Sequence, residues 1–389
     1  MKRFPANALL ALGSLVLALS ALEFALAFFA PHKVLTRAYH ERYDPVMGWV
    51  NKPLKNEGVH FEYAPSLFFH VTHNSLGLRG KETGYEKRPG TRRILFAGDS
   101  YFWGYGVSDA EVLTEVLQRA LPPSYEVLNG GTIGYGTDQE FLWLKNEGLR
   151  YRPDIVIFGF SAANDLVEIA TSVAYFTPKP IFVFEGNDLV LKNVPVPRTE
   201  QADRKSLGSP RTAFGKLKQY LRYHTHTYPF VAARLNSRPD WRDFFVTVGL
   251  ADEYLQEIGD VPVITNPPQD VMDVALKLIL DARKISEEAG ARFVLVFIPD
   301  KERTPDGKIR VEAVKENVSV VNSERSSVIR ELAVRYKVPY LDLLPVVREH
   351  ARKGEALYNS DRTDHHWTAL GHRVFSAEIQ MFLKTNGLL

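Results

Sequence analysis

The sequence predicts an α/β fold with a parallel sheet of about five strands, preceded by one transmembrane helix. Between residues 92 and 158, short apolar runs alternate with helical patterns three times in succession, which is typical of a parallel sheet with helical crossovers. The alternation stops near residue 171 and returns near residue 271. A long apolar stretch close to the N-terminus forms a separate element.

The apolar N-terminal stretch comprises residues 8–30 and follows Lys2 and Arg3. As a helix it spans about 34 Å, enough to cross a bilayer core. The basic start predicts a single-pass protein of a bacterial-type cell membrane, with the remaining chain extracytoplasmic (periplasmic). Residues 25–27, Ala-Leu-Ala, resemble a signal-peptidase site, so a cleaved signal peptide is the alternative. The apolar run is longer than a usual signal core, which favours the retained anchor.

The rest of the chain has the composition of a globular protein without cysteine. Of 389 residues, 45% are hydrophobic and 24% are charged, which is ample for a core. The net charge is +2, and no basic stripe is interleaved with aromatic residues, so a nucleic-acid partner is not expected. Because cysteine is absent, disulfides, thiolate zinc sites and a cysteine nucleophile are excluded. We expect no cofactor and no metal.

The chain divides by pattern into three parts. They are an anchor at 1–33, a juxtamembrane lead-in at 34–90 that is rich in aromatic residues and glycine, and one domain at 91–389 with an insertion at about 171–268. Residues 181–191 of the insertion read as a hairpin that turns at Gly186 and Asn187. The insertion could cover one side of the site as a cap.

The elements of the domain follow from hydrophobic spacing and from helix start and stop residues. Ser108 with Glu111, and Thr137 with Glu140, have the spacing of a capping box at the start of a helix. Thr368 is expected to open the last helix. In chain order we expect a strand at 94–97, a helix at 112–121, a strand at 127–129, a helix at 137–149, a strand at 154–158, a helix at 271–289, a strand at 293–298, a helix at 323–336, a strand at 338–343 and a last helix from 368 to 387.

Ser100 is the candidate nucleophile. It stands in the string ILFAGDS, directly after a strand, where Gly98 lets the backbone bend tightly. Because parallel strands bring their carboxyl ends to one edge, the loop that carries Ser100 is expected to open onto a cleft. A serine hydroxyl needs a neighbouring base to become a nucleophile. The alternative is a serine that only caps the next helix.

Two further loops at this edge offer hydrogen-bond donors for an oxyanion. The loop NGGTIGYG follows the second strand, and we select Gly134 as a backbone N–H donor. Asn164 follows the third strand, and its side-chain amide could supply another donor, with the backbone N–H of Ser100 as a third. The alternatives are a glycine required by a turn and an asparagine that caps a helix.

The string SDRTDHHW near the C-terminus offers a base and an acid. We select His366 as the base because a helix follows it at once, and Asp364 as the carboxylate that orients it. His365 is the rival base. A metal pair of adjacent histidines with Asp364 is the alternative, although neighbouring histidines on a loop diverge.

These blocks together resemble the SGNH (GDSL-type) hydrolases. Ser100, Gly134, Asn164 and His366 stand in the family's order and on the expected elements. The resemblance covers roughly residues 92–170 and 290–385, and it implies a flavodoxin-like three-layer α/β/α sandwich. The segment HNSLGLRGKETGYEKRPGTRRI also looks like the lead-in of envelope members, in which an Asn, a Gly and an Arg precede the GDS strand. The pattern G-x-S-x-G of α/β-hydrolases is absent.

The acid departs from the family pattern. Most members carry Asp three residues before the histidine, where this chain has Thr363. Asp-His-His-Trp instead resembles the branch that includes the alginate O-acetylation proteins, in which Asp stands two before His and Trp follows. In that branch the string precedes the serine, whereas here it comes last. Asp364 is therefore the expected acid, with Asp361 in reserve.

Aromatic and histidine residues elsewhere have simpler explanations. Aromatic faces near the site suit sugar rings, but core packing is the preferred explanation; the residues are Tyr101, Trp103, Tyr105 and Trp367. Four further histidines could suggest a metal, and we assign none to them; they are His70, His73, His224 and His226.

Three functions follow as hypotheses. The first is a serine esterase that deacylates an acylated small molecule or an envelope or exopolysaccharide carbohydrate through an acyl-enzyme. The second uses the same residues as a polysaccharide O-acetyltransferase, with polysaccharide-assembly proteins as partners. The third is a catalytically inactive SGNH domain that binds glycan or a partner.

Overall fold

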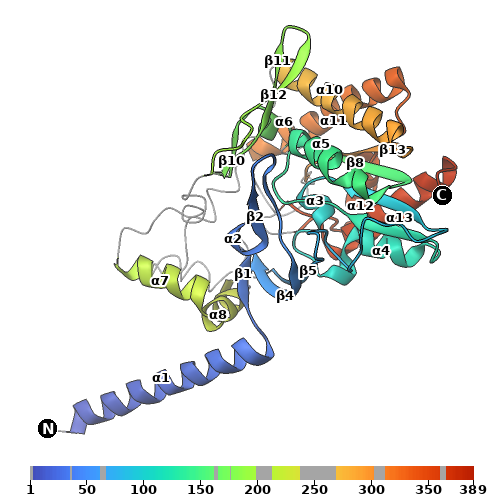
Figure 1. The fold of residues 1–389 in the computed structure, drawn as a ribbon. Coiled ribbons are helices and arrows are strands. Elements are labelled where there is room, and N and C mark those ends of the chain that lie inside the picture. The colour runs from blue at the N-terminus through green and yellow to red at the C-terminus, as the bar shows by residue number, and fades with distance from the viewer. Residues whose placement is uncertain are drawn as a thin grey trace.

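The fold is that of a computed structural model (Figure 1). It describes residues 3–35, 37–61, 67–161, 165–175, 177–198, 213–236, 269–301, 312–359 and 365–389.

A parallel five-stranded sheet forms the centre of the molecule, as predicted. Its order is β14-β13-β8-β6-β7, and every neighbouring pair is parallel. The first strand of this sheet in chain order, β6, lies between β7 and β8, which makes a topological switch point beside it. The strands are β6 (Arg92–Ala97), β7 (Tyr125–Asn129), β8 (Ile155–Ser161), β13 (Arg292–Ile298) and β14 (Tyr340–Asp342).

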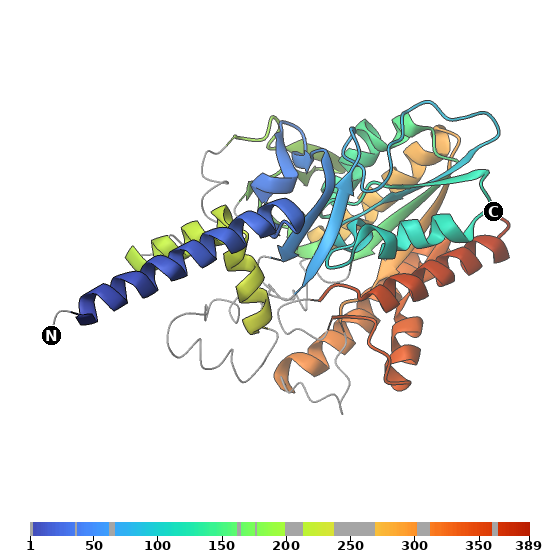
Figure 2. The same cartoon turned by 90° about the horizontal axis from the view of Figure 1, so that it is seen from below.

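Helices cover both faces of this sheet and make three layers (Figures 1 and 2). One face carries α5 (Thr137–Asn146), α6 (Asp165–Ile169), α10 (Gln269–Glu288) and α11 (Glu312–Tyr336), and the other carries α4 (Leu113–Ala120), α12 (Leu344–Arg352) and α13 (Ala369–Thr385). Leu144, Leu278 and Ile329 belong to the core of the first face, and Leu117 and Phe375 to that of the second. Each buried side chain of this size contributes about 1.5–3 kcal/mol. The predicted α/β/α sandwich is therefore confirmed.

The lead-in packs on the edge of this sheet. Its strands β1, β4 and β5 form one small sheet, and β2 and β3 form a hairpin. Arg79 then makes antiparallel bridges to His73 of β5 and Asn129 of β7, which ties the lead-in to the central sheet. The elements are β1 (Lys33–Leu35), α2 (Arg37–His40), β2 (Glu41–Asp44), β3 (Gly48–Asn51), β4 (Leu54–Phe61) and β5 (Phe68–His73).

The insertion contains the predicted hairpin. Glu185 of β11 pairs with Asp188 of β12, and the turn between them is Gly186 and Asn187. Gly186 has φ +64°, a conformation that favours glycine. The described elements are β9 (Val173–Ala174), β10 (Thr177–Pro178), β11 (Ile181–Glu185), β12 (Asp188–Lys192), α7 (Ala213–His224) and α8 (Thr227–Asn236).

Two helix starts differ from the prediction. The capping box of Ser108 and Glu111 forms, but it closes a 3-10 turn, η1 (Asp109–Glu111), ahead of α4. The second capping box is wrong: Gly136 caps α5, and the Thr137 hydroxyl donates to Asp165 instead (3.1 Å). At the last helix, the Thr368 side chain accepts the N–H of Gly371, as expected.

The N-terminal helix α1 (Arg3–Phe29) projects from the body (Figures 1 and 2). Its stretch Asn7–Phe29 has a mean hydropathy of 2.2, and only 6% of that apolar window is buried. The helix is long and apolar enough to cross a membrane, and a signal sequence has the same properties.

Candidate active site

Ser100 begins a one-turn helix, α3 (Ser100–Trp103), directly after β6. The Asp99 side chain caps this turn by accepting the N–H of Tyr101 (2.9 Å). Gly98 has no room for a side chain, since a Cβ there would lie 2.6 Å from the ring of Phe102. Gly104 ends the turn with φ 88°. The backbone therefore bends sharply at the carboxyl end of the strand and holds Ser100 in a fixed position.

His366 lies against this turn. Its Nε2 is 2.8 Å from the Oγ of Ser100, a hydrogen-bond distance. Both residues are 7% exposed, so the pair is largely shielded from water but still reachable. The next residue, Trp367, is fully buried against Phe375 of α13 and anchors the loop in the core. The backbone carbonyl of His366 also accepts the N–H of Asn359 (2.9 Å).

Two rings stack on the imidazole of His366. Tyr105 lies 4.6 Å away with an interplanar angle of 22°, and His365 lies 4.5 Å away at 25°. The hydroxyl of Tyr101 donates to the backbone carbonyl of His365 (3.3 Å). His365, the rival base of the sequence prediction, is thereby held beside the His366 ring. Nothing in the sequence pattern assigned this stacking role to Tyr105, because the contact joins two distant segments.

The glycine loop after β7 is fastened to the serine turn. Thr132 donates its N–H to the carbonyl of Gly98 (3.0 Å). A Cβ at Gly131 would lie 2.3 Å from the backbone nitrogen of Trp103, so only glycine allows this approach. Gly134 has φ +72°. The predicted donor loop thus lies beside the turn that carries Ser100.

Three of the predicted site residues lie outside the described residues. They are Asn164, Asp364 and Asp361. The structure does place Asp165, the neighbour of Asn164, at the start of α6, where its carboxylate accepts the N–H of Ser161, the last residue of β8 (2.7 Å). Since the Thr137 hydroxyl also donates to it, Asp165 ties the end of β8 to the start of α5.

Buried carboxyl groups lie behind these loops. Burial raises the pKa of Asp165 well above its ordinary value, and the nearby Asp99 carboxylate adds to the effect. Burial also raises the pKa of Glu140, with Asp165 as the main charged neighbour. The pair therefore keeps a proton at a pH at which ordinary carboxyls have lost theirs. Among the described residues, no group of three or more acidic or histidine side chains could hold a metal ion.

Arg79 supports the far end of the serine turn. Its guanidinium donates to the carbonyl oxygens of Trp103 (2.8 Å), Gly104 (2.5 Å) and Val107 (2.6 Å). It also pairs with Asp109 (3.1 Å) and lies 4.4 Å from the Trp103 ring. Its side chain is 1% exposed. Arg79 belongs to the lead-in segment HNSLGLRGKETGYEKRPGTRRI. This segment therefore supplies a side chain that supports the loop after α3.

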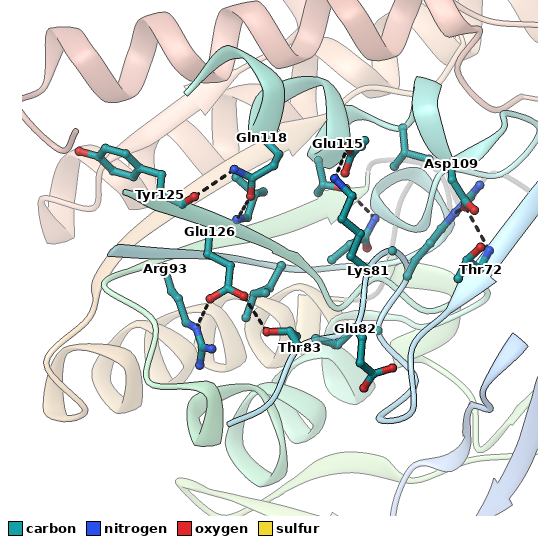
Figure 3. A pocket seen from close by; sticks show the side chains of 18 of the residues that line it. Thr72, Lys81, Glu82, Thr83, Arg93, Asp109, Glu115, Gln118, Tyr125 and Glu126 are labelled. Atoms are coloured by element: carbon teal, nitrogen blue, oxygen red, sulfur yellow. Dashed lines mark hydrogen bonds and ion pairs between the residues drawn. The ribbon is translucent and has the colours of Figure 1, made fainter. Parts of the chain in front are cut away.

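A cavity of about 750 Å³ lies elsewhere, between the lead-in, α4 and the outer edge of β7 (Figure 3). Neither Ser100 nor His366 lines it. Gln118 satisfies backbone groups at the outer edge of β7: its side-chain amide donates to the carbonyl of Tyr125 (3.0 Å) and accepts the N–H of Val127 (2.8 Å). The cavity is therefore separate from the Ser–His pair, and its strand edge is already hydrogen-bonded.

The C-terminal part of the chain has a family match. Residues 265–388 match the family model described as the SGNH hydrolase-like domain of the acetyltransferase AlgX. This span contains His366 but not Ser100. The comparison with curated proteins finds no match. The predicted SGNH resemblance is thus confirmed for this part of the domain.

The comparison with solved structures finds matches of low identity. A GDSL-like lipase from Bacteroides thetaiotaomicron is 10% identical, with 78% of this chain and 93% of that chain covered and a TM-score of 0.36. A catalytic mutant of an acetylxylan esterase from Geobacillus stearothermophilus is 11% identical, with 75% and 94% covered and a TM-score of 0.38. These scores are too low to support a conclusion about activity or substrate.

Proposed function

We propose that this chain is an SGNH-type serine enzyme that forms an acyl-enzyme at Ser100 and deacylates an envelope or exopolysaccharide carbohydrate. The observation that carries the proposal is the 2.8 Å contact between Ser100 Oγ and His366 Nε2. This distance allows the imidazole to take the hydroxyl proton as the oxygen attacks. The family match to an SGNH hydrolase-like domain supports the same chemistry.

The reaction would run in two steps. Ser100 Oγ attacks the acyl carbon while His366 takes its proton, and the oxyanion is held by the N–H groups of Ser100 and Gly134 and by the side chain of Asn164. His366 then gives the proton to the leaving alcohol, and the acyl-enzyme forms. Water, deprotonated by His366, releases the acid. Asp364, with Asp361 in reserve, would hold the imidazole through Nδ1.

Hydrolysis of p-nitrophenyl acetate tests this proposal. The full-length protein in detergent should release p-nitrophenolate, and Ser100→Ala should reduce kcat/KM by roughly 10³-fold or more. Thr114→Ala is a matched control, since it removes another buried hydroxyl, one that contacts Asn129 and not His366. Equal rates for the wild type and Ser100→Ala would refute the proposal.

A sugar hydroxyl, in place of water, is the alternative acceptor of the acyl group from Ser100. The description of the matched family model names an acetyltransferase. This favours a second candidate function, that of a polysaccharide O-acetyltransferase. Only the second step changes, because His366 would deprotonate the sugar instead of water. An acyl donor and an oligosaccharide acceptor should then give an O-acylated sugar, and free acid alone under all acceptors would exclude transfer.

The proposed location is the cell membrane, with α1 retained as an anchor and the remaining chain periplasmic. The length and hydropathy of α1 support it. In this arrangement the anchor (1–33), the lead-in (34–90) and the SGNH domain (91–389, insertion at about 171–268) would act beside polysaccharide-assembly proteins. Protease added to intact spheroplasts should digest the domain; complete protection would place it on the other side.

A further inference from the structure

We propose that α7 and α8 form a docking surface for an anionic phospholipid bilayer, beside the point where α1 leaves the membrane. The inference goes beyond the acyl-transfer proposal and depends only on α1 being retained as a membrane helix. Four observations carry it: the attachment of α8 to α1, the exposed apolar side chains of both helices, the charge of their segment and their place in the fold.

Helix α8 is attached to the end of α1. The carboxylate of Glu23 accepts the N–H of His226 (2.8 and 3.0 Å to its two oxygens) and the N–H of Thr227 (2.8 Å). A carboxylate is stabilised there because the first N–H groups of a helix have no partner within it. Glu23 lies six residues before Phe29, the last residue of α1, which is about 9 Å along the helix axis. The start of α8 is thereby held at the level of the membrane interface.

Large apolar side chains of α7 and α8 are exposed. Leu217 is 54% exposed, Tyr220 is 58% exposed and Val231 is 40% exposed. Leu217, Tyr220 and His224 are spaced three and four residues apart, so they share one face of α7. Tyr220 stacks on His224 with ring centroids 4.5 Å apart. An amphipathic tyrosine beside a leucine is typical of a helix at the headgroup level of a bilayer.

The charge of this segment suits anionic lipid. From residue 213 to residue 236, which α7 and α8 span, the sequence has no Asp or Glu, whereas the whole chain is nearly neutral at +2. Each basic side chain near an anionic membrane surface contributes about 1 kcal/mol. The basic residues of α7 and α8 are Lys216, Lys218, Arg222 and Arg234, and of these Arg222 is buried.

The place of the two helices agrees with a membrane partner. Both views show α7 and α8 at the end of the molecule from which α1 projects, away from the central sheet (Figures 1 and 2). A surface that is continuous with a membrane helix, apolar on one face and basic in sequence fits a bilayer better than it fits a soluble partner. Docking would fix the height of the SGNH domain above the membrane.

Single-cysteine labelling tests the proposal, because the native chain contains no cysteine. Full-length Leu217→Cys and Tyr220→Cys would carry an environment-sensitive fluorophore in nanodiscs of phosphatidylcholine and phosphatidylglycerol with spin-labelled quencher lipids. Leu17→Cys within α1 is the reference for a buried label. Val334→Cys on α11, where the native side chain is 73% exposed, is the reference for a label in water.

Labels at 217 and 220 should be quenched nearly as strongly as the label at 17 and far more than the label at 334. Without phosphatidylglycerol, or with Lys216→Glu and Lys218→Glu combined, the ratio of docked to undocked protein should fall by about tenfold or more. Free inorganic phosphate should not compete.

Quenching at 217 and 220 no greater than at 334, with 17 quenched, would overturn the docking surface alone. Equal quenching with and without anionic lipid would overturn its charge dependence. An unquenched label at 17 would overturn the docking surface and the anchor together. Fluorophosphonate labelling of Ser100 in the same samples reports on the acyl-transfer proposal separately.

Discussion

The Nε2 of His366 lies 2.8 Å from the Oγ of Ser100, although 266 positions separate the two residues in the chain. The sheet order explains their meeting: Ser100 follows the strand beside the topological switch point, and His366 precedes the last helix, which packs against α4 on the same face. Two buried aromatic anchors, Trp103 and Trp367, fix the segments on either side.

Arg79→Met should destabilise the protein and reduce activity. Three buried carbonyl oxygens after Ser100 would lose their donor, which costs about 2–4 kcal/mol in the free energy of unfolding. The loosened turn should lower kcat by roughly tenfold or more. Thermal unfolding and ester hydrolysis measure the two effects.

Lys81→Met is the control for Arg79→Met. Lys81 and Arg79 both line the cavity of Figure 3. The side chain of Lys81, however, is 81% exposed, and its ion pair with Glu115 lies at the surface. Such a pair contributes about 1 kcal/mol or less. Equal losses from the two variants would show that the buried contacts of Arg79 are not what matters.

Tyr105 is expected to hold the His366 ring by stacking. Tyr105→Leu should remove a ring contact of about 0.5–1.5 kcal/mol and lower kcat by roughly two- to tenfold with little change in KM. Tyr105→Phe keeps the ring and should stay within about twofold of the wild type. If the Phe variant is as impaired as the Leu variant, the hydroxyl rather than the ring is responsible.

Gly134→Ala should reduce activity beyond its effect on stability. Gly134 has φ +72°, and the control position Gly186 has φ +64° in an exposed hairpin turn. An alanine in this conformation costs about 1–2 kcal/mol at either position. Hydrolysis rates should fall for Gly134→Ala and stay near the wild type for Gly186→Ala. An equal loss of hydrolysis rate in both variants would show that the loop containing Gly134 is not part of the oxyanion site.

Much of this arrangement was predictable from the sequence, since the central strands are buried on both faces and read as short apolar runs. The place of Ser100 was predictable because it comes shortly after the apolar strand β6, whereas the roles of Gly134, Asn164 and Asp364 stay predictions. The Thr137 cap was wrong because the buried Asp165 draws its hydroxyl away from the helix terminus. The contacts of Arg79 and Tyr105 join segments distant in the chain, so periodicity alone gives no indication of them.

His73 should make stability depend on acid pH. It is buried, its Nε2 accepts the indole N–H of Trp103 (2.8 Å), and its Nδ1 contacts the carbonyl of Lys52 (2.8 Å). Burial lowers its pKa from 6.5 to about 3. As the pH falls below about 6.5, the unfolded chain takes up a proton that the folded protein refuses. The free energy of unfolding therefore drops by about 1.4 kcal/mol per pH unit from this residue until the pH nears 3.

His73→Gln should remove this share of the acid sensitivity. Other buried groups titrate in both proteins, so the test compares the slopes of stability against pH for the wild type and the variant, from chemical unfolding in detergent. The variant should have the shallower slope between about pH 6 and 4. Identical slopes would mean that His73 is not held neutral by the fold.

Fluorophosphonate labelling followed by peptide mapping tests the central contact most directly. The reagent reports a serine that a neighbouring base has activated, whatever the natural acyl group. The account predicts a label on Ser100 of the full-length protein, and labelling at least about 10³-fold slower in His366→Ala, with His365→Ala near the wild-type rate. A label on another residue, no label at all, or labelling of Ser100 that does not depend on His366 would contradict it.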